Sequence, residues 1–192
     1  MGENPIQTGS PAHLLRERCT RIELLVLDVD GVLTDGSIIY GDNGVEVKAF
    51  HVRDGSGLKA WQLSGKRTAV ITGRTSRVVD VRAAELGLSP VFQGAGDKWA
   101  AYRQILASGP WEPEQVCVMG DDLPDLPLLA DCGLAVAVAD ACPEVRAAAH
   151  YVTRAAGGRG AVREAIEVIM HCQGSWPSMV QRFARRGSGF QS

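Results

Sequence analysis

The feature that most constrains the fold is a series of short, unbroken apolar runs. Four strong runs and two weaker ones have this character: residues 24–27, 68–71, 116–119, 134–139, 91–92 and 151–152. Strands buried on both faces read as continuous apolar runs, whereas half-solvated strands alternate with polar residues. Predicted helices separate the runs, at residues 55–63, 76–86, 98–107, 125–130, 143–149 and 160–170. This alternation predicts a doubly wound, mostly parallel, Rossmann-like α/β sheet.

Residues 37–52 interrupt this rhythm. They alternate apolar and polar around Gly41-Asp42-Asn43-Gly44, which is a strong turn signal, and so predict a β-hairpin projecting from the sheet. We expect a single domain over residues 21–172, preceded by an N-terminal arm over residues 1–20 and followed by a flexible tail over residues 173–192.

Composition excludes several classes of protein. The net charge of −2 gives no reason to expect nucleic acid or an acidic membrane as a partner, and no apolar run is long enough to span a bilayer. The N-terminus does not have the pattern of a signal peptide. The number of cysteines is odd, at five, and none are arranged as C-x-x-C, so reduced thiols in a cytoplasmic protein are expected.

Residues suited to phosphoryl chemistry follow the first three strong runs. Asp28 and Asp30 follow the first run, Thr72 the second, and Asp121-Asp122 the third, while Lys98 opens the helix before the third. In an open parallel sheet, ligands bind beyond the carboxyl ends of the strands. Any one of these residues alone has a plain alternative, as a turn former or a solvated side chain. The ordered set is far more specific, and predicts one catalytic site.

Charge suggests a role for each of these residues. A carboxylate that attacks a phosphate dianion meets repulsion, which Mg²⁺ bound to Asp28 and Asp121 would cancel. The Lys98 ammonium and the Thr72 hydroxyl can stabilise the phosphoryl oxygens. Asp30 is placed to act as general acid and then as general base. Asp122 is a further candidate metal ligand, although it and Asp125 have the alternative of bracing the site or capping a helix.

The motifs resemble those of haloacid dehalogenase phosphatases. Leu27-Asp28-Val29-Asp30-Gly31-Val32-Leu33-Thr34-Asp35-Gly36 is similar to the first motif, and Ile71-Thr72-Gly73-Arg74, Lys98 and Gly120-Asp121-Asp122-Leu123-Pro124-Asp125 to the others. Val52-Arg53-Asp54-Gly55, Asp97-Lys98 and the segment from Gly157 to Glu164 narrow the resemblance to the 3-deoxy-D-manno-octulosonate 8-phosphate phosphatases. The similarity covers roughly residues 23–170.

This resemblance implies a phosphoric monoester hydrolase of lipopolysaccharide precursor synthesis with Asp28 as nucleophile. It implies Mg²⁺ as cofactor, with the backbone carbonyl of Asp30 as an added ligand. It also implies a set of substrate-binding residues: Asp30, His51, Val52, Arg53, Asp54, Gly55, Lys59, Gly73, Arg74, Arg82 and Lys98. His51, Ser56 and Lys59 depart from the commoner residues of the family, Asn, Tyr and Arg.

A cap domain would be inserted after the first motif or between Thr72 and Lys98, and neither interval can hold one beyond the hairpin. The resemblance implies a homotetramer in which a neighbouring subunit closes the site and the C-terminal tail reaches it. A nonulosonate 9-phosphate phosphatase is the nearest rival. A receiver domain would carry its acidic pair after the first strand and its phosphorylated Asp later, which is the reverse order. A non-catalytic oligomerisation module is the third alternative, and the intact motif set argues against it.

Overall fold

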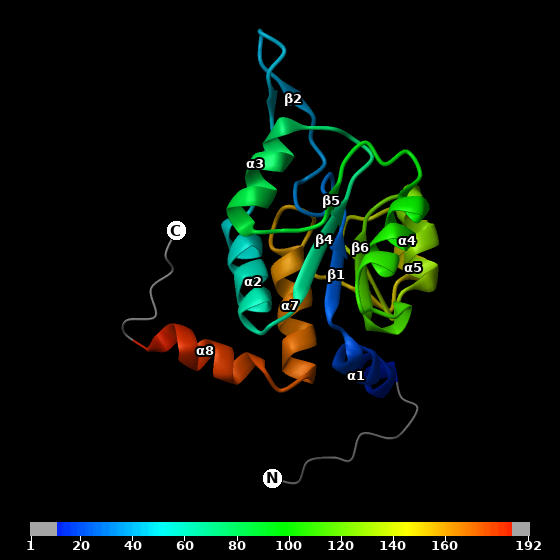
Figure 1. The fold of residues 1–192 in the computed structure, drawn as a ribbon, viewed down its shortest axis with the longest axis vertical. Helices are drawn as coiled ribbons and strands as arrows, with labels where there is room; N and C mark the ends of the chain where they lie inside the picture. The colour runs from blue at the N-terminus through cyan, green and yellow to red at the C-terminus, as the bar shows by residue number, and fades with distance from the viewer. Residues whose placement is uncertain (1–10, 186–192) are drawn as a thin grey trace.

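The computed structural model describes residues 11–185, which form a main sheet with helices on both faces and a small two-stranded hairpin (Figure 1). The sheet has six strands: β1 (Leu24–Leu27), β4 (Arg67–Ile71), β5 (Val91–Phe92), β6 (Val116–Gly120), β7 (Leu134–Ala137) and β8 (Tyr151–Val152). Every pairing is parallel, and the strand order is β5-β4-β1-β6-β7-β8. The predicted doubly wound parallel sheet is confirmed.

Strand register brings the predicted site residues to one edge of the sheet. Leu27, the last residue of β1, aligns with Val70 of β4 on one side and with Met119 of β6 on the other. The loops that follow these three strands therefore begin at nearly the same level. Strands β1, β6 and β7 are buried along their whole length, which explains why their sequences are unbroken apolar runs.

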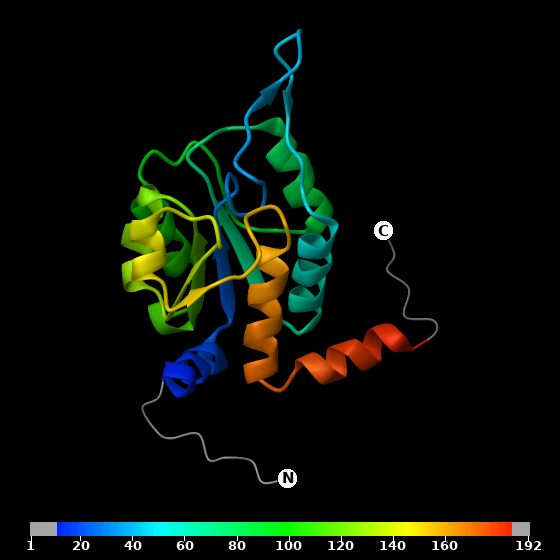
Figure 2. The same cartoon turned by 180° about the vertical axis from the view of Figure 1, so that it is seen from behind.

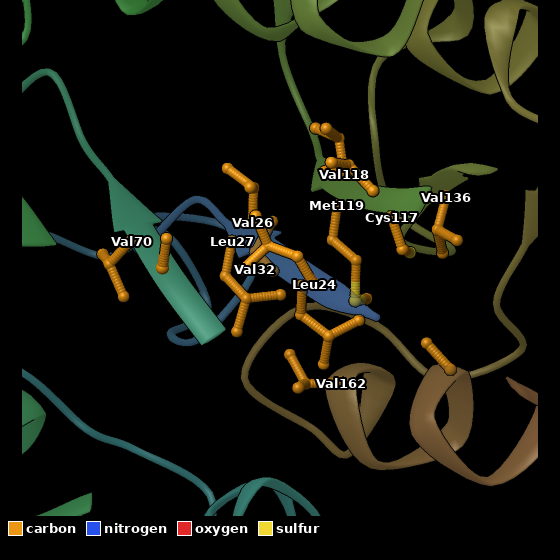
Figure 3. Packing of buried hydrophobic residues seen from close by; sticks show 14 of the residues in the cluster. Leu24, Val26, Leu27, Val32, Val70, Cys117, Val118, Met119, Val136 and Val162 are labelled. Carbon is orange, nitrogen blue, oxygen red and sulfur yellow. The ribbon is translucent and has the colours of Figure 1, made fainter. Parts of the chain in front are cut away.

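Two layers of helices cover the sheet (Figures 1 and 2). One face carries α2 (Val52–Leu63), α3 (Arg77–Leu86) and α7 (Ala161–Cys172), and the other carries α4 (Lys98–Ser108), α5 (Leu126–Asp131) and α6 (Pro143–Ala148). Helix α1 (Pro11–Arg21) lies at the end of the sheet where β1 begins. Helix α7 buries Val162 and Ile166 completely, and Figure 3 shows Val162 close to Leu24 of the central strand. In the part of the chain that the structure describes, no helix is long and apolar enough to cross a bilayer.

The predicted hairpin projects beyond the edge of the sheet where the strands end (Figure 1). Its strands, β2 (Ile39–Tyr40) and β3 (Glu46–Val47), pair antiparallel, with Ile39 opposite Val47. Gly44 in the turn has a positive φ of 74°, a conformation that favours glycine. Among the described residues, nothing but this hairpin and its connections lies between β1 and α2, so the chain has no cap domain inserted there.

Both ends of the described chain correct the expectation of an arm and a tail. Helix α1 packs against α7 and buries Cys19 completely, so the domain begins near Pro11 and not at residue 21. Helix α8 (Trp176–Ala184) occupies part of the predicted tail and buries Met179. Its apolar residues recur at helical spacing, from Trp176 through Met179 and Val180 to Phe183. Residues 1–10 and 186–192 lie outside the described part.

Some predicted boundaries also shift. Helix α2 begins at Val52 and not at Gly55, and Asp54 lies in its first turn, where a carboxylate favours the helix. The helix predicted at residues 125–130 is a 3₁₀ turn at Leu123–Asp125 followed by α5. A second 3₁₀ turn, at Pro113–Gln115, precedes β6.

Candidate active site

The loops after β1, β4 and β6 surround a hollow of about 350 Å³, together with the segment that leads into α4. Every residue predicted to be catalytic lines it, and so do Asp121 and Asp122. The complete lining is Asp28, Asp30, Thr72, Gly73, Arg74, Ala95, Gly96, Lys98, Asp121, Asp122 and Pro124. The side chains of Asp28, Thr72 and Lys98 are buried beneath it. The structure therefore brings together Asp28 and Asp122, which are 94 positions apart in the chain.

Lys98 lies between two carboxylates at the base of the hollow. Its Nζ is 3.0 Å from Asp28 Oδ2 and 2.7 Å from Asp125 Oδ1. Asp97 caps α4 by accepting a hydrogen bond from the Ala100 amide, so the helix begins with Lys98 directed into the site. The other oxygen of Asp28, Oδ1, accepts a hydrogen bond from the Val29 amide at 2.7 Å. Asp28 is thus held in place by a backbone donor and an ammonium group.

Asp121 contributes a further carboxylate, and part of it has no protein partner. Its Oδ1 is buried without a hydrogen bond, which is costly for a carboxylate oxygen unless a ligand binds it. The loop after β1 passes very close to this carboxylate. A Cβ at Gly31 would collide with it, and Gly31 also has a φ of 92°. Only glycine allows the two loops to meet here.

The donor set fits a divalent cation. Oxygens of Asp28, Asp121 and Asp125 lie within 4.8 Å of one another, and carboxylates are the ligands that Mg²⁺ prefers. Asp125 is already occupied, because Oδ1 accepts from Lys98 and Oδ2 from the amides of Asp121 and Asp122. Asp28 and Asp121 are therefore better candidate ligands than Asp125, which braces the site.

The side chains of Asp122 and Asp30 do not belong to this cluster of carboxylates. Asp122 is exposed, and its Oδ1 accepts a hydrogen bond from the Leu123 amide at 2.8 Å, which favours the capping alternative over metal binding. The Asp30 side chain is not among the clustered carboxylates. Its backbone carbonyl as a metal ligand stays a prediction.

The crowding of carboxylates shifts their protonation. Burial and the nearby Asp125 raise the pKa of Asp28 to about 7, against an opposing effect from Lys98. Burial and Asp125 likewise raise the pKa of Asp121 to about 6. Burial alone would lower the pKa of Lys98, but Asp28 and Asp125 outweigh it, so the pKa lies above its usual value. One ammonium cannot balance three carboxylates, and the site has an excess of negative charge.

This excess predicts how stability depends on pH and metal. Because the folded-state pKa values of Asp28 and Asp121 are raised, the folded protein binds protons more tightly than the unfolded chain. Without a divalent cation, the unfolding temperature should therefore fall by several degrees between pH 5 and pH 8. Mg²⁺ should raise it more at pH 8 than at pH 5, since deprotonated carboxylates bind metal better. Calorimetry at both pH values, with EDTA or Mg²⁺, measures both effects; a larger Mg²⁺ effect at pH 5 would contradict them.

The upper wall of the hollow is made by Arg74, Asp30 and the hairpin. Arg74 Nη2 donates to Tyr40 Oη at 3.1 Å and to Glu46 Oε1 at 2.9 Å, and its Nε is 3.8 Å from Asp30 Oδ2. These hydrogen bonds raise the pKa of Arg74, so it stays charged. On the other side, Lys48 Nζ forms an ion pair with Asp30 Oδ1. The hairpin is therefore tied to the predicted acid/base by charged groups.

The segment from His51 to Gly55 does not reach the hollow within one chain. Asp54 is buried, and its carboxylate accepts hydrogen bonds from the amides of Gly160 and Arg163 at the start of α7. Burial raises its pKa. This structural use competes with the predicted contact to substrate. His51 lies against Gly160, whereas Val52 and Arg53 are exposed.

Lys59 and Arg82 also lie away from the hollow. Lys59 Nζ donates to the Glu85 carbonyl at 3.0 Å, and Arg82 pairs with the Glu85 carboxylate at 2.8 Å. Arg82 crosses over Gly55 and stacks on the ring of Phe50. Of the predicted substrate-binding residues, only Asp30, Gly73, Arg74 and Lys98 line the hollow. The others stay predictions.

Sequence reasoning missed Lys48. Its side chain is 1% exposed, although it lies in a stretch whose alternation predicts a solvated polar face. The position of Lys48 in the alternating pattern gives no sign of burial, because the ion pair with Asp30 forms only when the hairpin folds back over the loop after β1. Glu46 and Tyr40, which hold Arg74, were missed for the same reason.

Comparison with known proteins shows to which family the chain belongs. Residues 90–166 match the model of the haloacid dehalogenase-like hydrolases. Over 165 residues the chain is 49% identical to the 3-deoxy-D-manno-octulosonate 8-phosphate phosphatase of Yersinia pestis, covering 86% of this chain and 88% of that protein. The chain belongs to the 3-deoxy-D-manno-octulosonate 8-phosphate phosphatase family.

Solved structures of this phosphatase family have the same fold. The crystal structure of the Yersinia pestis phosphatase superposes with a TM-score of 0.84 at 47% identity, covering 85% of this chain and 89% of that one. The Moraxella catarrhalis phosphatase superposes with a TM-score of 0.86 at 41% identity, covering 88% of this chain and 97% of that one. Its structure is a complex with a magnesium ion, a phosphate ion and a KDO molecule.

Proposed function

We propose that this chain is a Mg²⁺-dependent phosphatase that hydrolyses 3-deoxy-D-manno-octulosonate 8-phosphate to the free sugar acid and phosphate, a step of lipopolysaccharide precursor synthesis. The observation that carries the proposal is the convergence of Asp28, Asp30, Thr72, Lys98 and Asp121 on one hollow, in a chain so similar to phosphatases of that name. The complex of the Moraxella catarrhalis phosphatase with magnesium, phosphate and KDO supports both the metal and the sugar acid.

In the proposed reaction, a carboxylate oxygen of Asp28 attacks phosphorus and the bond from phosphorus to the sugar oxygen breaks. Asp30 gives a proton to that oxygen, so the free sugar acid leaves. Asp30 then takes a proton from water, whose oxygen attacks the aspartyl phosphate and releases phosphate. Lys98 and the Thr72 hydroxyl stabilise the phosphoryl oxygens. Mg²⁺ held by Asp28 and Asp121 would offset the repulsion between carboxylate and phosphate.

Phosphate release from a panel of sugar-acid phosphates, in the presence of Mg²⁺, tests this proposal. We expect turnover of the octulosonate 8-phosphate to exceed that of nonulosonate 9-phosphates, with Asp28→Asn as the blank. Preference for a nonulosonate phosphate would transfer the same chemistry to that substrate. Release from none of the panel would contradict the proposal and return attention to a non-catalytic role.

We also propose that the chain forms a homotetramer in which a neighbouring subunit closes the site. The hairpin supports this, because its apolar side chains are about half exposed: Ile38 52%, Ile39 48%, Tyr40 60%, Val45 56% and Val47 51%. An apolar patch of this kind is typical of a protein interface. The hollow also lacks Arg53, Lys59 and Arg82, and closure by a second chain would supply such groups.

Placing charges on the hairpin should disrupt this assembly. Ile39 and Val47 are opposite each other across the hairpin, so the double variant Ile39→Glu/Val47→Glu puts two like charges on the proposed interface. We expect light scattering to report monomers or dimers for this variant. Leu14→Glu is the matched control, since Leu14 is 50% exposed on α1, at the far end from the hairpin. A tetramer that survives the double substitution would place the interface elsewhere.

We propose a cytoplasmic location for the enzyme. All five cysteines are free, and Cys19 and Cys117 are completely buried. Burial raises the pKa of Cys19 to about 12, with Cys172 adding to the shift, so this thiol is unreactive. Reduced thiols are typical of the cytoplasm.

A further inference from the structure

Lys48 is buried without lining the hollow. Its side chain is 1% exposed, whereas Asp30 next to it is 19% exposed and lines the hollow. Burying an ammonium group is costly unless carboxylates surround it. Lys48 has two such partners, because Nζ pairs with Asp30 Oδ1 and lies 3.5 Å from Glu46 Oε1.

The charges around Lys48 alternate in sign. Glu46 lies between Lys48 and Arg74, and Asp30 lies between the same two cations, with Oδ1 toward Lys48 and Oδ2 toward Arg74. Two cations and two carboxylates therefore balance each other. They come from three separate segments, which are the loop after β1, the hairpin and the loop after β4.

This arrangement distinguishes the two oxygens of Asp30. Oδ1 is held by the buried Lys48. Oδ2 is 3.8 Å from Arg74 Nε, which is longer than a normal hydrogen bond. An acid/base must present one oxygen to its reaction partner in a fixed direction. A carboxylate clamped through one oxygen meets that need.

We infer that Lys48 is a positioning residue: it clamps Asp30 through Oδ1 so that Oδ2 faces the leaving oxygen of the substrate. This inference rests on the proposed phosphatase function. It makes the hairpin part of the catalytic apparatus as well as a surface for assembly. Lys48 itself does not line the hollow.

Leaving groups of different basicity separate this role from a structural one. A sugar alkoxide needs a proton as it departs, whereas p-nitrophenolate is a weak base that leaves without one. Single-turnover release of the leaving group reports only the first step. For Lys48→Met, we expect this rate to fall by on the order of 10²-fold with the sugar phosphate and by less than about threefold with p-nitrophenyl phosphate.

Two further variants complete the test on the full chain with Mg²⁺. Lys48→Arg keeps the charge and should recover most of the rate with the sugar phosphate. Lys66→Met removes a lysine that also pairs with a carboxylate, Glu23 at 2.7 Å, but lies far from the hollow; it should leave the ratio of the two rates unchanged. If Lys48→Met does not fold, Lys48→Gln replaces it in the same comparison.

Equal losses with both leaving groups, or a change in KM alone, would overturn the inference. So would a Lys48→Arg enzyme as poor as Lys48→Met. If the wild-type enzyme fails on every sugar-acid phosphate, the proposed function falls. The ratio between another alkyl phosphate and p-nitrophenyl phosphate then still decides the role of Lys48.

Discussion

Asp28→Asn should lose about 10⁵-fold or more in kcat for the sugar phosphate, since no other group can take the phosphoryl group from its position. The amide of asparagine is a poor nucleophile and keeps nearly the same shape. The same substitution should stabilise the metal-free protein at pH 8. It removes one of three crowded carboxylates, and a neutral side chain does not bear the cost that raises the pKa of Asp28 to about 7.

Asp28→Asn is expected to lower activity and to raise the stability of the metal-free protein, and these opposite effects make the prediction specific. Phosphate release measures the first and thermal unfolding with EDTA the second. Asp42→Asn is the matched control, because Asp42 is exposed in the hairpin turn, and neither quantity should change by much. An Asp28→Asn protein that is both inactive and markedly less stable without metal would indicate that Asp28 supports the fold instead of straining it.

Lys98→Met should lower both the stability and the activity of the protein. The Lys98 side chain is 8% exposed and its ammonium contacts Asp28 and Asp125, so its removal leaves carboxylates buried without compensation. Breaking a buried pair in this way costs about 3–5 kcal/mol of unfolding free energy. Loss of a positive charge beside the phosphoryl group should lower kcat by on the order of 10³-fold. Urea unfolding and steady-state kinetics measure the two losses.

The pH dependence of this loss provides a second check. The destabilisation by Lys98→Met should be smaller at pH 5 than at pH 8, because Asp28 and Asp121 become protonated below their pKa values of about 7 and 6. Lys66→Met is the control. Its partner Glu23 is 45% exposed, so about 1 kcal/mol is expected for that pair. A similar destabilisation for both variants at pH 8 would contradict the described charge balance.

Much of the architecture was predictable because local pattern and burial agree. The runs that became β1, β6 and β7 are unbroken because these strands are buried on both faces. The order of the motifs then predicted the site, since parallel strands in register end at one edge. Asp28, Thr72, Lys98 and Asp121 converge there as expected.

The ends of the domain were less predictable. Helix α8 has an apolar stripe that a search for helical spacing could have found, whereas α1 has only a weak pattern and becomes ordered by packing against α7. Short helices of this kind are marginal alone and depend on tertiary contacts. Composition predicted an arm and a tail at the two ends, whereas packing against α7 stabilises the helices α1 and α8 there.

Tertiary structure alone decided which polar residues pair. Asp54 reads as part of a substrate motif, yet it caps α7 from more than 100 positions away. Lys48 reads as a solvated hairpin residue, yet it is buried against Asp30. Apolar periodicity reflects burial along a single element. The strands, the helices and the motifs at the strand ends could therefore be predicted from the chain alone. A charge pair depends on the distance between two elements, and that distance exists only once the hairpin and the loops have folded over the sheet.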